Sequence, residues 1–212
     1  MIPIYHYDLE QRSDEWRLIR RGRFTGTDAG LLIASGTKRA DKLGTGAETA
    51  LYLKCAELVS DYEPQEFDRY ALQIGREREP EAVSAYEELI FPESVTPCGF
   101  VEYGDYFGFS PDGLVCSDGY IEIKCPQAPE YFRYLMTGEI KSDYVAQMQW
   151  GLWITGRSWC DHVVYNSDFG GHPIDVTRIY RDEKLMHLFS EKTKTIESAM
   201  DNLLFEYEKI SS

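Results

Sequence analysis

Residues 109–125 constrain the fold most strongly, because a turn signal there precedes an alternating strand. The Ser-Pro-Asp-Gly string at 110–113 has Pro and Gly where a type I turn favours them. Residues 120–125 alternate polar and apolar side chains, as a strand does. Between them, Ser-Asp-Gly at 117–119 suits a three-residue hairpin loop with Gly in the left-handed conformation. The stretch therefore predicts a β-hairpin.

That loop sets the expected register of the hairpin. It places Leu114 opposite Glu122, and Asp112 opposite Lys124, so that the charged groups share one face. Asp112 and Glu122 become diagonal neighbours, roughly 7–8 Å apart at the backbone. Two carboxylates beside a lysine can hold a divalent metal and position a water for phosphodiester cleavage. A two-residue turn would put Asp112 on the other face, and a solvated ion pair on an ordinary hairpin is the simpler alternative.

Four segments of the chain resemble the phage lambda exonuclease family of viral recombination nucleases. This family belongs to the superfamily whose signature is an acid followed at a distance by Asp/Glu-x-Lys. The segments are Trp-Arg-Leu-Ile-Arg-Arg-Gly at 16–22 with Thr-Gly-Thr at 25–27, Gly-Arg-Glu-Arg-Glu at 75–79, Ser-Pro-Asp-Gly-Leu at 110–114 with Glu-Ile-Lys-Cys-Pro at 122–126, and Tyr-Val-Ala-Gln-Met-Gln-Trp at 144–150. The resemblance spans nearly the whole chain. It implies an α/β fold with a restriction-endonuclease-like core, a central mixed β-sheet flanked by helices.

The resemblance also implies a metal site. Asp112, Glu122 and the carbonyl of Ile123 would hold one or two Mg²⁺ ions, with Mn²⁺ as a substitute. Oxygen ligands favour these ions over Zn²⁺. Lys124 would orient or deprotonate the attacking water, and the sequence leaves both roles open.

Two further catalytic residues rest on the resemblance alone. Glu79 would be another metal ligand or an orienting carboxylate, although most acids in such a helical run are merely solvated. Gln147 would hydrogen-bond a phosphate or the attacking water, although the helical pattern by itself predicts only a surface residue.

A third group would grip the terminal 5′ phosphate. The resemblance assigns this role to Arg20, Thr27 and Ser110, with Gln147 beside them. A guanidinium forms bidentate contacts with phosphate, and a hydroxyl at a helix N-terminus adds a donor beside backbone amides. The family usually has Ser at the position of Thr27, which could equally be a plain helix cap.

By the same resemblance, the substrate is a linear double-stranded DNA end, digested 5′ to 3′ to leave a 3′ single strand for an annealing protein. Family members form toroidal trimers, so a processive homotrimeric ring is implied. Two alternatives remain. One is a restriction-like or nicking endonuclease of the same superfamily, and the other is a non-catalytic acidic interaction module.

The net charge of −14 argues against a nucleic-acid partner, since DNA-binding proteins usually carry a basic surplus. Positive charge is concentrated, however, and a ring could direct it toward a DNA channel while the acids face outward. The candidate channel residues, beside Arg20, are Arg17, Arg21, Arg23, Arg76 and Arg78. Alternatively, the arginines form one solvated helix face.

Length and composition indicate a single domain over residues 1–212, with 43% hydrophobic residues for a core, and the resemblance implies that it is a nuclease domain. We find no apolar run near eighteen residues and no basic-then-apolar leader, so we expect no membrane span or secretory signal. A cytoplasmic location in a bacterial host cell, with a phage or prophage origin, is the corresponding expectation. The five cysteines include no C-x-x-C pair and are expected to be buried free thiols. The four histidines show no ligand spacing and are expected to be structural or surface residues.

Periodicity and punctuation predict the order of elements. We predict helices at residues 14–21, 28–34, 48–60, 71–89, 129–137 and 142–154, and a long last helix that opens at 181–184. We predict strands at residues 94–103, 106–109, 113–116, 120–124, 163–165 and 174–180. Ser13 and Thr27 are expected to cap the first two helices, and 36–46 reads as a mobile loop. The core face of the last helix is expected to comprise Leu185, Phe189, Ile196, Met200, Leu203 and Tyr207.

Overall fold

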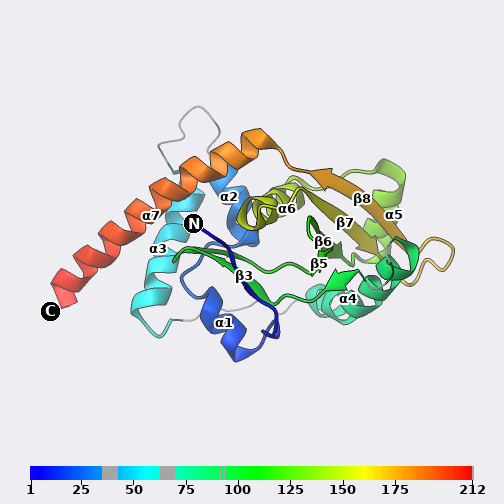
Figure 1. Cartoon of the computed structure of the whole chain (residues 1–212), viewed down its shortest axis with the longest axis horizontal. Coiled ribbons are helices and arrows are strands. Elements are labelled where there is room, and N and C mark those ends of the chain that lie inside the picture. Colours follow the sequence, from blue (N-terminus) through cyan, green and yellow to red (C-terminus); the bar gives the residue numbers. More distant parts are fainter. Residues whose placement is uncertain (35–42, 63–69, 91, 93, 212) are drawn as a thin grey trace.

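The protein has a mixed α/β architecture with two β-sheets, as predicted (Figure 1). The computed structural model describes residues 1–34, 43–62, 70–90, 92 and 94–211, so most of the expected loop at 36–46 lies outside the described residues. The larger sheet has the order β2 (Val95–Thr96), β5 (Gly113–Val115), β6 (Gly119–Lys124), β7 (Trp159–Tyr165) and β8 (Ile174–Tyr180). Its strands pair antiparallel except for β6 and β7, which run parallel. The smaller, antiparallel sheet has the order β1 (Ile4–His6), β3 (Phe100–Tyr103) and β4 (Phe107–Phe109).

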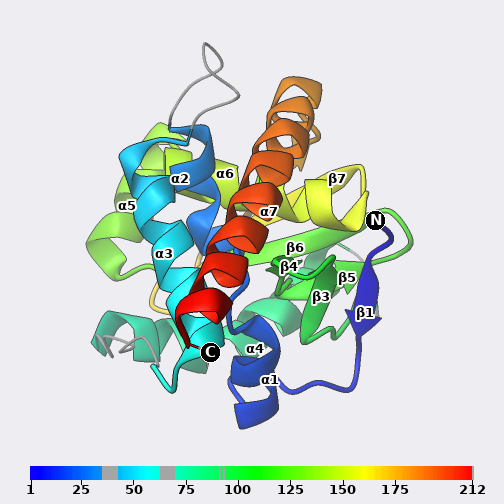
Figure 2. The same ribbon diagram turned by 90° about the vertical axis from the view of Figure 1, so that its left-hand side faces the viewer.

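Helices cover both faces of the larger sheet. The helices are α1 (Asp14–Arg20), the short 3₁₀ helix η1 (Gly26–Asp28), α2 (Ala29–Ile33), α3 (Thr45–Val59), α4 (Tyr70–Leu89), α5 (Ala128–Thr137), α6 (Ser142–Thr155) and α7 (Glu183–Ser211). Ala82 and Tyr86 of α4 pack on one face, against apolar residues of β5, β6 and β7. Helices α5 and α6 cover the opposite face. The long helix α7 runs beside α3 and α6 and extends away from the larger sheet (Figures 1 and 2).

The predicted hairpin forms, but its register is shifted by two residues. Val115 pairs with Gly119, and Leu114 pairs with Tyr120 instead of Glu122. The loop therefore comprises residues 116–118, and the left-handed residue is Cys116, with a φ of 49°, not Gly119. Because side chains alternate with a period of two, this shift keeps every side chain on its predicted face.

The predicted strand at 94–103 is wrong as a single element. It divides into β2 and β3, which belong to different sheets, and Pro97 lies between them. A proline has no backbone N–H for the ladder, so it favours such a break. Strand β1 was not predicted. Strand β7 starts at Trp159, before the predicted start at 163. The prediction was too short because Asp161 and His162 are polar and interrupt the apolar pattern of this buried strand.

Those polar residues of β7 are both buried, and one is held by an ionic network. Asp161 accepts two hydrogen bonds of 2.8 Å from the guanidinium of Arg178 and one of 2.7 Å from the Tyr86 hydroxyl. The network joins β7, β8 and α4. A buried carboxylate that is bonded in this way can occupy a core strand without a large desolvation cost.

One of the two predicted helix caps is confirmed and the other is wrong. Ser13 accepts a hydrogen bond from the Trp16 amide, and Gly22, with a φ of 72°, ends the turn after α1. Thr27 is not a cap. Thr25 takes that place, in a capping box with Asp28 at the start of η1.

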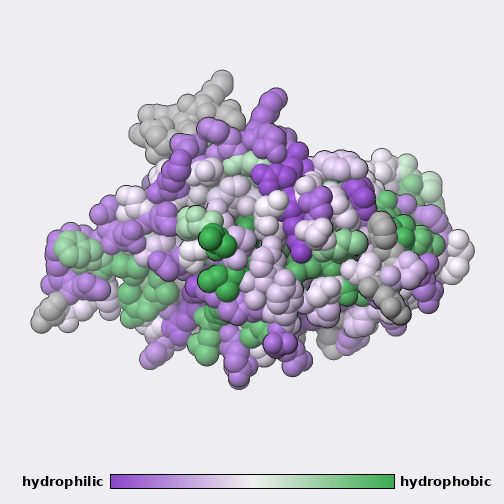
Figure 3. Space-filling model, viewed as in Figure 1, coloured by the Kyte–Doolittle hydropathy of each residue, from purple (hydrophilic) through white to green (hydrophobic). Residues whose placement is uncertain are grey.

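Two residues that were predicted to be buried are exposed. Tyr207 is exposed near the end of α7, where the helix has passed beyond the core, and Cys116 is exposed at the hairpin tip. All five cysteines are free, and Cys125 is half-buried. Figure 3 shows apolar patches over the end of the molecule formed by α3 and the last turns of α7. The exposed apolar residues of these helices include Leu58, Phe205 and Ile210. None of the helices within the described residues has the length and apolarity needed to cross a bilayer.

Candidate active site

The predicted carboxylates and lysine line one cavity of about 680 Å³. Asp112 lies immediately before β5, and extending the observed register places it directly opposite Glu122 of β6. Its carboxylate Oδ2 accepts a hydrogen bond of 2.6 Å from the backbone amide of Ile123. The turn therefore carries Asp112 across the hairpin to the strand that bears the other two residues.

Lys124 joins the carboxylates to α6. Its ammonium group lies 2.6 Å from Glu122 Oε1 and 3.5 Å from the side-chain carbonyl of Gln147. It also lies 4.9 Å from the centre of the Tyr144 ring, which favours a cation. Burial opposes the charge of Lys124, but the carboxylates of Glu122 and Asp112 outweigh it and raise its pKa above the ordinary value. The lysine is therefore held in its protonated form.

Close approach of η1 helps to place Gln147. A Cβ atom on Gly26 would come within 2.9 Å of Gln147 Cγ, so only glycine leaves room for this side chain. Gln147 and Tyr144 of α6 both contact the Lys124 ammonium group.

The two carboxylates form an electrostatic environment that fits a cation. Burial, and then the charge of Glu122, raise the pKa of Asp112 well above its usual range. Glu122 is only 1% exposed, and its Oε2 has no hydrogen-bond partner among the described residues. A divalent cation between them would relieve both the repulsion and the unsatisfied oxygen. Within the described residues no group of three or more His, Cys, Asp or Glu side chains could hold a metal, so the carbonyl of Ile123 stays a predicted ligand.

Glu79 lines the same cavity but has a partner there. Its carboxylate is 2.6 Å from the guanidinium of Arg12, a residue with a φ of 73° that also lines the cavity. A positive φ is uncommon for arginine and marks a backbone held by its surroundings. The sequence analysis missed Arg12, because nothing in the sequence signals this conformation. Direct metal coordination by Glu79 stays a prediction.

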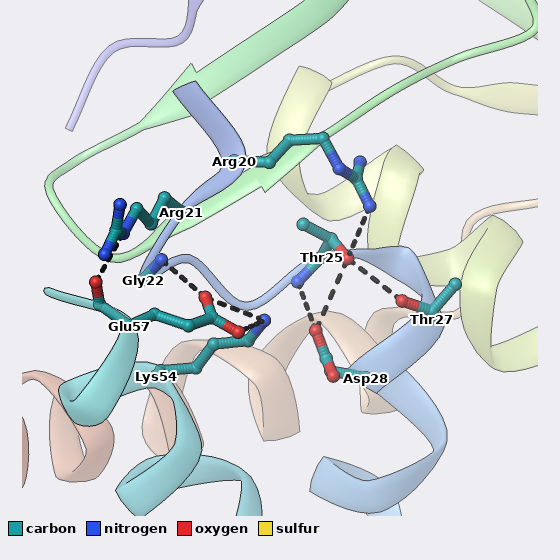
Figure 4. A network of polar contacts seen from close by, with 8 residues as sticks. All are labelled: Arg20, Arg21, Gly22, Thr25, Thr27, Asp28, Lys54 and Glu57. Carbon is teal, nitrogen blue, oxygen red and sulfur yellow. Dashed lines mark hydrogen bonds and ion pairs between the residues drawn. The ribbon is translucent and has the colours of Figure 1, made fainter. Parts of the chain in front are cut away.

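The three predicted phosphate-binding residues come together in the same cavity. The Arg20 guanidinium donates a hydrogen bond of 3.0 Å to the Ser110 hydroxyl. It donates a second one, of 3.4 Å, to the Thr25 hydroxyl, which lies 3.1 Å from the Thr27 hydroxyl (Figure 4). Trp16 supports Arg20, with its ring 4.2 Å beneath the guanidinium. Thr25 was missed by the sequence analysis, which chose only one hydroxyl of the Thr-Gly-Thr string.

Four of the predicted channel arginines make intramolecular contacts outside the cavity. Arg21 donates to the backbone carbonyl of Glu57 at 2.5 Å and points away from Arg20 in Figure 4. Arg23 binds Glu102 at 2.5 Å, Arg17 pairs with Asp14 on the surface, and Arg78 pairs with Asp168. The side chain of Arg76 lies outside the described residues. A role for these residues in a DNA channel stays a prediction.

His162 is a cavity residue that the sequence analysis treated only as structural or surface. It is the register partner of Glu122 on β7 and is 2% exposed, and in the part of the chain that the structure describes neither ring nitrogen has a hydrogen-bond partner. Burial, and then the charge of Lys124, lower its pKa to about 4, so the imidazole is neutral near pH 7. No spacing in the sequence could have indicated it, because a parallel strand pairing brings it to Glu122.

Comparison with known proteins identifies the family. Residues 15–158 match the profile of the YqaJ-like viral recombinase domain. The chain belongs to this family. The predicted relationship to the phage lambda exonucleases is thereby confirmed. No match was found among curated proteins.

Solved structures agree with this membership of the YqaJ-like family. LHK-Exo, an alkaline exonuclease from Laribacter hongkongensis, is 29% identical with a TM-score of 0.75, and the match covers 93% of this chain and 100% of LHK-Exo. Its complex with dAMP is 30% identical with a TM-score of 0.76 and the same coverage. A phage-related exonuclease from Haemophilus somnus 129PT, with 18% identity and a TM-score of 0.65 over 87% of this chain and 96% of that one, shares the fold.

Proposed function

We propose that the chain is a Mg²⁺-dependent exonuclease that digests one strand of linear double-stranded DNA, 5′ to 3′, from a 5′-phosphorylated end. One observation carries the proposal. A guanidinium–hydroxyl cluster suited to a terminal phosphate and a carboxylate–lysine cluster suited to a phosphodiester line the same cavity. Membership of the YqaJ-like family and the likeness to an alkaline exonuclease support this function.

The guanidinium cluster would hold the 5′ end. Arg20 is preorganised by Trp16 and Ser110, so it loses little conformational freedom when a phosphate binds. The hydroxyls of Thr25 and Thr27 would add donors to the phosphate oxygens. The terminal nucleotide would then extend from this cluster toward Asp112 and Glu122.

The carboxylates would hold the metal. Asp112 and Glu122, with the carbonyl of Ile123, provide hard oxygen ligands that suit Mg²⁺, with Mn²⁺ as a substitute. When bound, the ion would supply Lewis-acid stabilisation of the charge that develops on the phosphate. Lys124 would orient the attacking water and neutralise that charge. Removal of a proton from that water by Lys124 is the alternative role.

The bonds that change account for stepwise digestion. Water attacks the phosphorus on the 3′ side of the terminal nucleotide, and the bond from phosphorus to the 3′ oxygen breaks. The 3′ oxygen takes a proton, so a 5′-mononucleotide leaves. The shortened strand begins with a new 5′ phosphate, which the Arg20 cluster can bind in the next cycle. LHK-Exo has been solved with dAMP, a mononucleotide of the kind that such a reaction releases.

We also propose how the enzyme works in its cell. Three copies would form a ring around DNA in the cytoplasm of a bacterial host, and the resulting 3′ strand would pass to the single-strand annealing protein of the same phage or prophage system. A ring reconciles DNA binding with a net charge of −14, because acids on its outer surface need not meet the DNA.

A digestion assay with three matched DNA substrates tests the proposal. We expect Mg²⁺-dependent release of mononucleotides from a linear duplex with 5′ phosphates, slower release from the same duplex with 5′ hydroxyls, and no cleavage of a covalently closed circle. Cleavage of the circle would instead show an endonuclease. A folded protein with no activity on any of the three would favour a non-catalytic role.

A further inference from the structure

Glu122 and His162 share an unusual feature of the cavity floor. They are register partners in the parallel pairing of β6 and β7, and both are almost fully buried. Glu122 Oε2 and both ring nitrogens of His162 lack hydrogen-bond partners within the described part of the chain. An unpaired buried polar atom is costly, so three of them at one register position call for an explanation.

The sheet places these atoms on the same side. Residues paired directly across neighbouring strands project to the same face, which puts Glu122, His162 and Thr177 of β8 in one row. The row lies on the face that carries the cavity, since both Glu122 and His162 line it. Tyr134 closes the row, with its hydroxyl 3.1 Å from that of Thr177 and its ring centre 5.8 Å from that of His162.

We infer that His162 is a positioning residue: its ring and the Oε2 of Glu122 are not bonded to each other in this structure, and a side-chain turn at metal binding would let the ring donate a hydrogen bond to Oε2 and so fix that carboxylate. The inference rests on the proposed function, because it concerns the same metal site. Glu122 Oε1 is already held by Lys124 at 2.6 Å. A donor on Oε2 would hold the second oxygen, and each carboxylate oxygen would retain a lone pair for a cation.

The chemistry of His162 suits this role. A neutral imidazole carries one N–H donor and adds no positive charge that would repel a cation. Carboxylates that bind metals are commonly oriented by hydrogen bonds from neighbouring groups, and loss of such a group typically weakens metal binding by about 10–100-fold. The rings of Tyr134 and Tyr144 pack beside His162, with ring centres at 5.8 and 6.3 Å, and keep it next to Glu122.

The test measures Mn²⁺ binding without DNA, by following the electron paramagnetic resonance signal of free Mn²⁺ during a titration. His162→Phe keeps an aromatic ring but removes the donor, and we expect it to weaken binding about tenfold or more. His162→Gln keeps an N–H group and should recover most of the affinity. His6→Phe is the matched control, because His6 bonds Glu102 outside the cavity and should not affect Mn²⁺.

The pattern of the variants decides the inference. Wild-type affinity in a folded His162→Phe protein would overturn it, and so would equal losses in the Phe and Gln variants, because a packing role predicts no rescue by an N–H donor. If His162→Phe does not fold, the smaller His162→Leu replaces it in the same comparison with Gln. No binding of Mn²⁺ by the wild type would also overturn the inference.

The test separates this inference from the proposed function. Mn²⁺ binding that depends on His162, in a protein that digests no DNA, would support the inference and contradict the exonuclease proposal. DNA digestion by a protein whose Mn²⁺ affinity does not change when His162 is substituted would support the exonuclease proposal and contradict the inference.

Discussion

Arg20 donates a hydrogen bond to the Ser110 hydroxyl over 3.0 Å, and this contact ties α1 to the turn that carries Asp112. The predicted phosphate-binding and metal-binding groups are thus linked, because Ser110 and Asp112 are separated by Pro111 alone. The contact explains why a phosphate held by Arg20 would stand at a defined distance from the carboxylates.

The first prediction concerns recognition of the 5′ end. Arg20→Ala should lose most of the preference for 5′-phosphorylated over 5′-hydroxyl duplexes, because it removes the bidentate donor. Arg17→Ala is the control, since Arg17 lies on the same helix and pairs with Asp14 on the surface. Initial rates on both duplexes give the ratio. A slower Arg20→Ala enzyme with an unchanged ratio would make Arg20 a general DNA contact.

The second prediction concerns the catalytic groups. Lys124→Ala and Glu122→Ala should each reduce digestion by about 10²-fold or more, as expected when a group that stabilises transition-state charge or holds the metal is lost. Chelation of divalent ions should abolish wild-type activity, and added Mg²⁺ should restore it. Circular dichroism must first show that each variant is folded. Near-normal digestion by a folded Lys124→Ala protein would refute the assignment.

The sequence predicted which residues share a face of the hairpin better than it predicted the register. The Asp112, Glu122 and Lys124 face was correct despite a register error of two residues, because alternation depends only on odd or even position. The pairing of Glu122 with His162, and of Glu79 with Arg12, could not be predicted. Both depend on contacts between distant segments, one across a parallel strand pair and one at a positive φ.

The third prediction follows from the lowered pKa of His162. Because its pKa is about 4 in the folded protein and near 6.5 when unfolded, the unfolded chain binds the proton more readily. The associated stability is fully present above pH 6.5 and is lost as the pH falls toward 4. Between pH 7.5 and 4.5 the wild type should therefore lose roughly 2–3 kcal/mol more unfolding free energy than His162→Phe. Urea denaturation at both pH values measures this, and equal losses would show that His162 is not buried and neutral.

The fourth prediction concerns how an acidic chain remains on DNA. If three copies enclose the duplex, a topological link would maintain contact even when individual phosphate interactions weaken. Loading should then fall steeply with salt, because it depends on counterion release. The length of the tract digested after loading should change much less.

Single-turnover digestion of a long duplex, with excess competitor DNA added after loading, separates these two quantities. A closed ring also requires one discrete oligomer, because a head-to-tail interface that closes leaves no free end for further growth. Sedimentation should therefore show a single trimeric species at micromolar concentration. A monomer, with or without DNA, would remove the ring as the explanation of processivity and leave Asp112, Glu122 and Lys124 unaffected.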